Sequence, residues 1–403
     1  MTPENLPPKT PDAPAAPHRF LSKAAWRLVY GAFLLLLFAG MEGIFRRHTA
    51  HSVEPILRMI LYDYGCLVRR DTGRFRFVPD PVLPYRLKPG FVFHSPDGHG
   101  VTRHNVQGFR ADAPFPEKTP EALRIICLGG STTYGASVVD NAGTYPAALE
   151  RFLNGDLRPA GGRKTEVFNL GVGGYTSQEV LLTLREYGLS LHPDVVLIQC
   201  GVNDVAPRFY PNFDPEYRHF RKPLLPLPTG FFARLVFRSH LVLVTGWKLG
   251  LLEPLTLQAR TQHPMPSAAE AAVNLARNRP DAYRKHLADA VALARDSGAR
   301  VWLLTEAHFF GASFRAPDEE ARLMDDLYRE GLVEHNMVVR NLARESGVGL
   351  VNLEEHMPLS PHYFSDPVHM TESGKLVKAR IIAESIRESL SALNLRTKAP
   401  GHS

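Results

Sequence analysis

The sequence predicts an α/β fold in which a parallel sheet carries helices on both faces, with a membrane-spanning helix ahead of it. Strand-like and helix-like segments alternate over the C-terminal two thirds of the chain, which is the pattern of a parallel sheet. Each strand-like segment is short and continuously apolar, as expected for strands buried on both faces. A long apolar run near the N-terminus lies between basic residues, which predicts the membrane helix.

Five segments are predicted to form the sheet, because each is short and continuously apolar. They are residues 124–128, 166–169, 195–199, 301–305 and 349–352. Helices are predicted where apolar residues recur at helical spacing. They are residues 145–154, 177–189, 282–296, 319–345 and 372–390. Thr176 and Glu179 fit a capping box at the start of the second helix.

The apolar run of residues 28–45 follows Lys23 and Arg27 and ends at Arg46 and Arg47. As a helix it is nearly long enough to cross a hydrocarbon core, which takes about 20 residues. We therefore predict a single-pass membrane anchor over residues 21–48, behind a disordered tail of residues 1–20 that is rich in Pro and Ala. A cleaved signal peptide is the alternative, but no convincing cleavage pattern of small residues follows residues 34–37.

The side of the membrane is harder to predict, because basic residues flank both ends of the apolar run and the positive-inside rule counts both sets. The short N-terminal tail favours an extracytoplasmic, periplasmic position for the rest of the chain.

The remaining chain divides by composition. Residues 49–120 are predicted to form an N-terminal accessory element, since residues 80–118 are dense in Pro, Gly and aromatic side chains. We expect this element to be a structural cover, with substrate contact by Arg110 as the alternative. Residues 121–395 are predicted to be the catalytic domain and residues 396–403 a tail.

An insertion is predicted within the catalytic domain, over residues 205–280. Because it leaves the end of a central strand, it is expected to lie beside the active site as a lid or pocket wall. Two alternatives stay open, namely an amphipathic surface lying on the membrane and plain packing against the core.

Composition limits the classes of partner. The chain has 403 residues, of which 44% are hydrophobic, and this is ample for a core. Its cysteines, Cys66, Cys127 and Cys200, show no paired spacing and are interpreted as core residues rather than disulfide or metal ligands.

The formal net charge is +6, but the basic residues are scattered without a nucleic-acid motif. We therefore expect no nucleic-acid partner and attribute the excess charge to attraction to a membrane surface.

Three separated segments place candidate functional residues at one edge of the predicted sheet. Ser131, the glycine-rich residues 171–174 and Asn203 each come directly after a predicted strand. Ligands bind beyond the carboxyl ends of the strands in such sheets. Ser131 is therefore predicted to be a nucleophile, and the alternative is a helix N-cap, a position that serine favours.

Asp366 and His369 lie three residues apart near the C-terminus. His369 is predicted to take the Ser131 proton, with Asp366 orienting the imidazole; the alternative is that both merely line a solvated loop. The oxyanion donors are predicted to be the backbone N–H groups of Ser131 and Gly174 and the side-chain amide of Asn203.

Three other kinds of functional site fit the sequence poorly. The glycine-rich run has Thr176 where a dinucleotide-binding loop needs its third glycine. A nucleophile elbow needs a glycine at the position of Thr133. The 17 histidines, including His48, His51 and His308, show no zinc-like spacing, and His308 is interpreted as either a substrate contact or a packed loop residue.

These blocks resemble the SGNH hydrolase family, also called GDSL-type esterases and lipases, in its membrane-anchored bacterial form. The resemblance spans roughly residues 122–392 and rests on Gly-Gly-Ser-Thr-Thr-Tyr-Gly, Asn-Leu-Gly-Val-Gly-Gly-Tyr-Thr, Gly-Val-Asn-Asp and Asp-Pro-Val-His. Gly130 replaces the aspartate of the Gly-Asp-Ser form, which removes no catalytic role. The resemblance implies a flavodoxin-like three-layer α/β/α sandwich, no metal cofactor and ester hydrolysis through an acyl-serine.

The sequence therefore predicts a membrane-anchored serine esterase that acts on a small acyl or acetyl ester, on an envelope glycan or lipid. One alternative is an O-acyltransferase acting on a sugar hydroxyl, which water exclusion by the insertion would favour. Another is a non-catalytic envelope-binding protein, although such a protein would not need nucleophile, base and oxyanion donors together.

Overall fold

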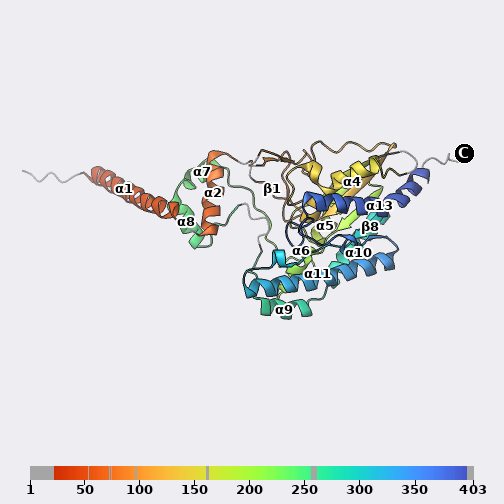
Figure 1. The fold of residues 1–403 in the computed structure, drawn as a ribbon. Coiled ribbons are helices and arrows are strands. Elements are labelled where there is room, and N and C mark those ends of the chain that lie inside the picture. Colours follow the sequence, from red (N-terminus) through yellow and green to blue (C-terminus); the bar gives the residue numbers. More distant parts are fainter. Residues whose placement is uncertain are drawn as a thin grey trace, which may run out of the picture. The chain divides into compact units, whose positions relative to one another are not determined.

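The computed structural model describes residues 22–52, 54–71, 73, 75–95, 98–159, 163–255 and 261–396 (Figure 1). The predicted tails, residues 1–20 and 396–403, lie outside this part of the chain except for Arg396. The chain divides into two compact units, residues 1–69 with 229–254 and residues 70–228 with 255–403. The first unit contains the apolar N-terminal helix, and the second contains the sheet.

Five parallel strands form the central sheet of the second unit, in the order β6-β5-β7-β8-β9. They are β5 (Ala122–Gly129), β6 (Lys164–Asn169), β7 (Val195–Gln199), β8 (Arg300–Leu304) and β9 (Gly349–Val351). Each corresponds to a predicted strand, so the predicted parallel sheet is confirmed. The strand order changes direction at β5, and ligands bind beyond the carboxyl ends of the strands at such a switch point.

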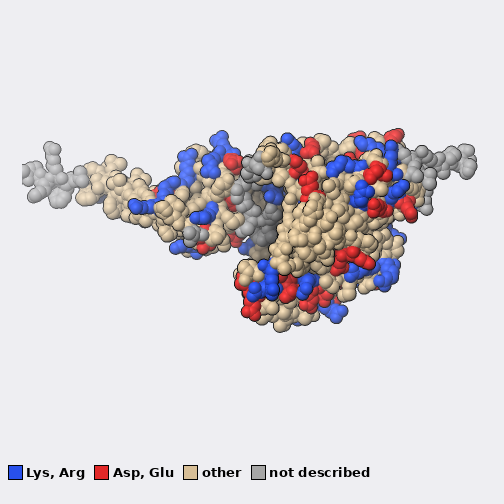
Figure 2. All heavy atoms as spheres, in the orientation of Figure 1, with Lys and Arg blue, Asp and Glu red and all other residues tan. Residues whose placement is uncertain are grey.

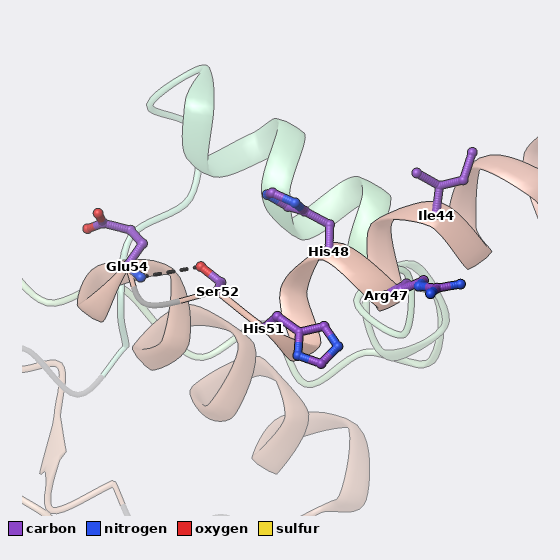
Figure 3. Close-up of a pocket in the computed structure, with 6 residues that line it drawn as sticks. All are labelled: Ile44, Arg47, His48, His51, Ser52 and Glu54. Atoms are coloured by element: carbon purple, nitrogen blue, oxygen red, sulfur yellow. Dashed lines mark hydrogen bonds between the residues drawn. The ribbon is translucent and has the colours of Figure 1, made fainter.

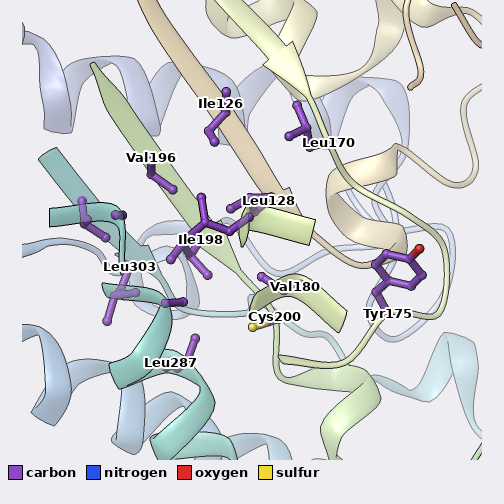
Figure 4. Packing of buried hydrophobic residues seen from close by; sticks show 14 of the residues in the cluster. Ile126, Leu128, Leu170, Tyr175, Val180, Val196, Ile198, Cys200, Leu287 and Leu303 are labelled. Atoms are coloured by element: carbon purple, nitrogen blue, oxygen red, sulfur yellow. The ribbon is translucent and has the colours of Figure 1, made fainter. Parts of the chain in front are cut away.

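Helices cover both faces of the sheet and complete the predicted three-layer sandwich (Figure 1). One face carries α4 (Tyr145–Asn154) and α13 (Glu372–Arg396), and the other carries α5 (Ser177–Thr183), α10 (Asp281–Asp296) and α11 (Glu319–Ser346). Side chains along β5 alternate between the two cores, with Ile125 and Cys127 in one and Ile126 and Leu128 in the other. Figure 4 shows the second core, in which apolar side chains of β5, β7 and β8 pack against Leu287 of α10.

The predicted helix over residues 177–189 changes form along its length. The α-helix α5 ends at Thr183, and a π-helical turn over Leu184–Gly188 and a 3-10 turn over Leu189–Leu191 follow it. Gly188 lies against the sheet, because a Cβ atom there would be 3.1 Å from Ile126 Cδ1. Packing of this turn on β5 is a tertiary contact that helical periodicity does not reveal.

Shorter elements surround the sheet in the second unit. They are α3 (Ser131–Tyr134), α6 (Val202–Val205), α9 (Ala268–Arg277), α12 (Leu353–His356) and 3-10 turns over Asn141–Gly143, Ala206–Phe209 and Ala312–Phe314. Before β5, β1 (Phe77–Val78) pairs with β2 (Arg86–Leu87), and β3 (Val92–His94) pairs with β4 (Val101–Arg103), both antiparallel. Tyr85 and Leu87 of this region join the core formed with α5 and α10, so the region belongs to the second unit.

The first unit consists of α1 (Lys23–Ala50), α2 (Pro55–Arg69), α7 (Phe231–Val236) and α8 (His240–Lys248). An 18-residue window of α1 has a mean hydropathy of 2.0 and is 0% buried. This length and composition suit a membrane span, and a signal sequence shares them. The surface of α1 is uncharged between Arg27 and Glu42, and Figure 2 shows few Lys, Arg, Asp or Glu atoms along most of this helix.

The two units divide the chain differently from the predicted domains. The predicted accessory element, residues 49–120, is split after Arg69, and the predicted insertion, residues 205–280, is split around residues 229–254. Residues 229–254 join α1 because Glu42 accepts hydrogen bonds from the start of α8, whereas α9 packs on α11 through Leu275 and Leu332. These long-range contacts decide the boundaries, and local composition does not report them.

Candidate active site

Ser131, His369 and Asp366 form one continuous chain of hydrogen bonds. His369 Nε2 lies 2.7 Å from Ser131 Oγ, and His369 Nδ1 lies 2.7 Å from Asp366 Oδ2. Ser131 begins α3 directly after β5, and the other two residues lie in the loop ahead of α13. The fold therefore brings together a hydroxyl and an imidazole that are 238 positions apart in the sequence.

Asp366 is held as an anion by its own loop. Its Oδ1 accepts the N–H groups of Val368 at 3.0 Å and His369 at 2.8 Å. Burial raises the pKa of the Asp366 carboxyl, but the hydrogen bonds from the His369 ring and from these amides outweigh it and lower the pKa to about 2. A carboxylate can only accept, so His369 Nδ1 carries the ring proton and Nε2 can accept the Ser131 proton.

Two glycines allow other segments to approach Ser131 closely. A Cβ atom at Gly129 would lie 2.2 Å from the Gln199 carbonyl oxygen, and one at Gly130 would lie 2.8 Å from Asn203 Nδ2. The Asn203 amide therefore lies against the residue that precedes Ser131. Its Nδ2 donates to the Tyr175 carbonyl at 2.9 Å, which leaves the second N–H of that amide for another acceptor.

Gly174 faces the same pocket as Ser131 and His369. Its φ of 87° is in the left-handed region, which glycine adopts without strain. The predicted oxyanion donors of Ser131, Gly174 and Asn203 thus come from three loops that follow β5, β6 and β7. Because α3 has a single turn, local N–H groups rather than a long helix supply the positive potential beside Ser131.

A model of the GDSL-like lipase/acylhydrolase family matches residues 127–376. The chain belongs to this family. It is therefore an SGNH-type hydrolase, and the matched region contains Ser131, Gly174, Asn203, Asp366 and His369. A search of curated proteins finds no match to the chain.

Several solved structures are similar to this hydrolase at low identity. A lipolytic G-D-S-L protein from Desulfitobacterium hafniense is 11% identical, with 65% of this chain and 98% of that chain covered and a TM-score of 0.39. A GDSL-like lipase from Bacteroides thetaiotaomicron is 17% identical, with coverages of 68% and 92% and a TM-score of 0.40. A mutant acetylxylan esterase from Geobacillus stearothermophilus is 15% identical, with coverages of 68% and 96% and a TM-score of 0.39.

Ser131 of this GDSL-like hydrolase lines a pocket of about 600 Å³. Ser131, Gly174 and His369 share its lining with two further groups. The region before β5 contributes Arg76, Phe91, Phe93, Thr102 and Arg110, and the loop after Ser131 contributes Tyr134, Ala136, Ser137, Val138 and Val139. Sequence reasoning did not place Phe91 or Phe93 beside Ser131, because no local sequence pattern links a short hairpin to a distant serine.

Arg110 anchors the loop that follows Ser131. Its guanidinium donates, over 2.7 to 3.2 Å, to Asn141 Oδ1 and to the carbonyls of Tyr134, Gly135, Val138, Val139 and Asp140. The Arg110 side chain is 3% exposed, and its guanidinium carbon lies 4.8 Å from the centre of the Tyr134 ring. Since protein acceptors occupy its donors, these contacts favour the structural interpretation of Arg110 over substrate contact.

Two buried lysines, which sequence reasoning missed, connect the segment that contains Ser131 to the region of His369 and α13. Lys375 Nζ donates to the Ala136 carbonyl and, at 2.9 Å, to the Met370 carbonyl. Lys378 Nζ donates to Gln199 Oε1. Burial lowers the pKa of both amines, that of Lys375 to about 7. A signal was present, because both lysines lie three or four residues from apolar positions of the predicted C-terminal helix.

Other candidates from the sequence lie outside this constellation. His308 Nδ1 contacts the Glu306 carbonyl at 3.3 Å and Glu354 Oε1 at 4.0 Å, and His308 does not line the pocket of Ser131. Cys66, Cys127 and Cys200 are free thiols, each buried. Within the described ranges, no group of three His, Cys, Asp or Glu side chains could hold a metal ion.

Proposed function

We propose that this protein is a serine esterase that hydrolyses a small acyl or acetyl ester through an acyl-serine intermediate. The observation that carries the proposal is the unbroken chain from Ser131 Oγ through the His369 ring to Asp366, with 2.7 Å at each link. This is the geometry that general-base activation of a serine requires. The chain ends in a pocket that has room for an acyl group.

In the first half of the reaction, Ser131 Oγ attacks the ester carbonyl carbon while its proton passes to His369 Nε2. The carbonyl π electrons move onto oxygen, and the N–H groups of Ser131, Gly174 and Asn203 stabilise that oxyanion. The tetrahedral intermediate collapses, the ester C–O bond breaks, and the imidazolium returns its proton to the leaving alkoxide. The acyl group then remains bonded to Ser131.

In the second half, water replaces the alcohol. His369 takes a proton from water, the hydroxide forms a bond to the acyl carbon, and the new tetrahedral intermediate expels Ser131 Oγ, which recovers the proton from His369. The anionic Asp366 stabilises the imidazolium in both halves without taking a proton itself.

Hydrolysis is favoured over acyl transfer to a sugar by the composition of the pocket. Transfer requires that water be excluded from the acyl-enzyme. The pocket lining comes from residues 76–139, Gly174 and His369, and within the described catalytic unit no residue of the predicted insertion contributes to it. An intact nucleophile, base and orienting carboxylate also argues against a purely binding role.

We further propose that α1 anchors the enzyme in a membrane, with the catalytic unit on the extracytoplasmic side. The hydropathy of α1 supports a span. Glu42 supports an uncleaved one, because it accepts Ser239 Oγ at 2.7 Å and the N–H groups of His240 at 3.0 Å and Leu241 at 3.1 Å. Cleavage behind α1 would leave the start of α8 without these bonds.

The C-terminal end of α1 has the composition of a membrane interface. A pocket of about 630 Å³ there is lined by Ile44, Arg47, His48, His51, Ser52 and Glu54 (Figure 3). Arg47, His48 and His51 are exposed and can face lipid headgroups. In the same unit, Phe231 and Phe232 of α7 are 70% and 77% exposed, which suits a surface in contact with the bilayer.

The nucleophile assignment is tested with the full-length protein in detergent or nanodiscs and p-nitrophenyl acetate as substrate. Ser131→Ala should lower kcat/KM by at least 1,000-fold, since a triad acts as a unit and residual catalysis comes only from binding and the oxyanion donors. The far-UV circular dichroism spectrum should not change. Ser385→Ala is the matched control, because Ser385 is exposed on α13 and does not line this pocket, and it should retain activity.

A Ser131→Ala protein that is as active as the wild type would refute the proposed nucleophile.

A second experiment adds a sugar acceptor to the wild-type reaction and distinguishes hydrolysis from acyl transfer. We expect released acetate to account for the consumed ester, whereas acetylated sugar as the main product would favour the acyltransferase.

A further inference from the structure

Three consecutive carbonyl groups of the loop after β6 are held from outside the loop. The Gly173 carbonyl accepts the Tyr85 hydroxyl at 2.9 Å, and the Tyr175 carbonyl accepts Asn203 Nδ2 at 2.9 Å. Between them, the Gly174 carbonyl accepts Arg221 Nη2. Each peptide plane of this short stretch is therefore fixed by a separate donor.

The Tyr85 bond bears directly on the predicted oxyanion donor. The Gly173 carbonyl and the Gly174 N–H belong to the same peptide group, and in a trans peptide they point in opposite directions. Fixing the carbonyl on Tyr85 therefore aims the N–H away from Tyr85. Among the described residues no acceptor forms a hydrogen bond with this N–H, and Gly174 lines the pocket of Ser131 and His369.

Arg221 determines which way the Tyr85 hydroxyl donates. Arg221 Nη1 donates to the Tyr85 oxygen at 3.0 Å, so the single hydroxyl proton is left for the Gly173 carbonyl. Burial raises the pKa of Tyr85 to about 12, partly offset by Arg221, and the phenol remains a donor. Arg221 itself is buried at 7% exposure, with Glu179 Oε1 3.7 Å from its Nη1.

We propose that Tyr85 and Arg221 are positioning residues that aim the Gly174 N–H at the oxyanion. The proposal rests on the proposed function, since it presumes that Ser131 forms a tetrahedral intermediate. The ordered chain from Arg221 through Tyr85 to the Gly173 carbonyl also polarises that peptide group and strengthens its N–H as a donor. Tyr85 comes from the region before β5 and Arg221 from the segment after β7, so both segments complete the oxyanion site.

Glycine at position 174 fits this arrangement. A Cβ atom there would lie 2.6 Å from the Tyr85 hydroxyl oxygen. The same approach that brings Tyr85 to the Gly173 carbonyl therefore excludes any side chain at residue 174.

Tyr85→Phe in the full-length protein tests the proposal, because it keeps the ring and removes only the hydroxyl. We expect kcat for p-nitrophenyl acetate to fall about 10- to 100-fold, below the 10²- to 10³-fold loss that follows complete removal of an oxyanion donor. KM should change less than about threefold. The affinity for phenylboronic acid, which forms a tetrahedral adduct with the serine, should fall by the same factor as kcat/KM, a readout that a purely structural role would not move.

Tyr187→Phe is the matched control. Its hydroxyl donates to Asp80 Oδ2 at 2.5 Å and makes no contact with residues 173–175 in the described structure. This variant should keep the wild-type kcat and boronate affinity. If Tyr85→Phe fails to fold, Arg221→Lys replaces it, because a lysine keeps the charge but has one nitrogen in place of the two that reach Tyr85 and Gly174.

Wild-type kcat and boronate affinity in a folded Tyr85→Phe or Arg221→Lys protein would overturn the assignment, as would a loss confined to KM. The two proposals fail separately. An active Ser131→Ala protein rejects the proposed nucleophile, whereas an inactive Ser131→Ala protein together with a fully active Tyr85→Phe protein rejects only the positioning role.

Discussion

Lys375 places an amine where solvent cannot reach it, between carbonyls that follow Ser131 and His369 in the chain. Its side chain is 2% exposed, and it joins the Ala136 and Met370 carbonyls. The neutral amine can make both bonds as a donor, so the contact does not require the charge. Burial lowers its pKa from 10.5 to about 7, which makes this residue a source of pH-dependent stability.

The direction in which pH changes the stability follows from the lowered pKa of Lys375. Between the folded pKa of about 7 and the ordinary value of 10.5, the unfolded chain binds more protons than the folded one, so stability rises with pH in this window and is lost as pH falls through 7. Lys375→Met removes this contribution. We expect wild-type stability relative to the variant to increase by about 2 kcal/mol from pH 7 to pH 9, measured by urea unfolding in parallel.

Lys285→Met is the control for that measurement. Lys285 is exposed on α10 and pairs with Asp289, so its removal should leave the pH dependence of unfolding as in the wild type. A stability difference between wild type and Lys375→Met that stays flat from pH 7 to pH 9 would contradict the burial argument.

The loop between α3 and the 3-10 turn over Asn141–Gly143 forms a wall of the pocket, although it contains no helix or strand. The Arg110 guanidinium donates hydrogen bonds to successive carbonyls along this loop. These bonds take the place of the backbone hydrogen bonds that a helix or a sheet would provide. A planar guanidinium with several donors suits this task, whereas an ammonium group does not. The region before β5 therefore stabilises the active-site wall as well as lining it.

Arg110→Met should destabilise the protein by about 3 kcal/mol or more, because it leaves several buried carbonyls without donors. It should also lower kcat at least tenfold, since the loop begins at the turn that carries Ser131. Arg103→Met, at an exposed position of β4, should change neither quantity by much. Equal urea midpoints for the Arg110 and Arg103 variants would show that the loop does not depend on this anchor.

The chain combines a hydrolase unit with a helical unit built from two distant segments, residues 1–69 and 229–254. Glu42 links these segments by capping α8. A carboxylate within an apolar helix is costly in a bilayer unless it is satisfied, and the N–H groups at the start of α8 satisfy it. The helical unit is thus consistent with an anchor that stays attached to the enzyme.

An alkaline phosphatase fused after Ser403 should be active in cells, because we propose that the catalytic unit is extracytoplasmic. The full-length protein should resist carbonate extraction from membranes, and mass spectrometry should find α1 retained. A fusion that is inactive although stably expressed would place the enzyme on the cytoplasmic side. A mature N-terminus beyond residue 50 would instead identify α1 as a signal sequence.

Much of the fold could be predicted because its information is local. The five strands are short apolar runs that only a doubly covered sheet can bury, and helices such as α4 begin and end where their apolar periodicity does. Ser131, Gly174 and Asn203 were predicted for the same reason, since each follows such a strand and parallel strands present their carboxyl ends at one edge. The division into two compact units was not predicted, because Glu42 and α8 meet only in the folded chain.

The amino-acid sequence by itself determined the α/β class, the strand positions, the family and the candidate nucleophile, base and carboxylate, because these depend on periodicity and on short motifs. Only the tertiary structure decided that Tyr85, Arg110, Arg221 and Lys375 hold the loops around Ser131. These side chains act on backbone carbonyls, and every residue has a carbonyl. No sequence pattern therefore identifies the carbonyl that accepts such a hydrogen bond. Tertiary packing alone decides which carbonyl each side chain reaches.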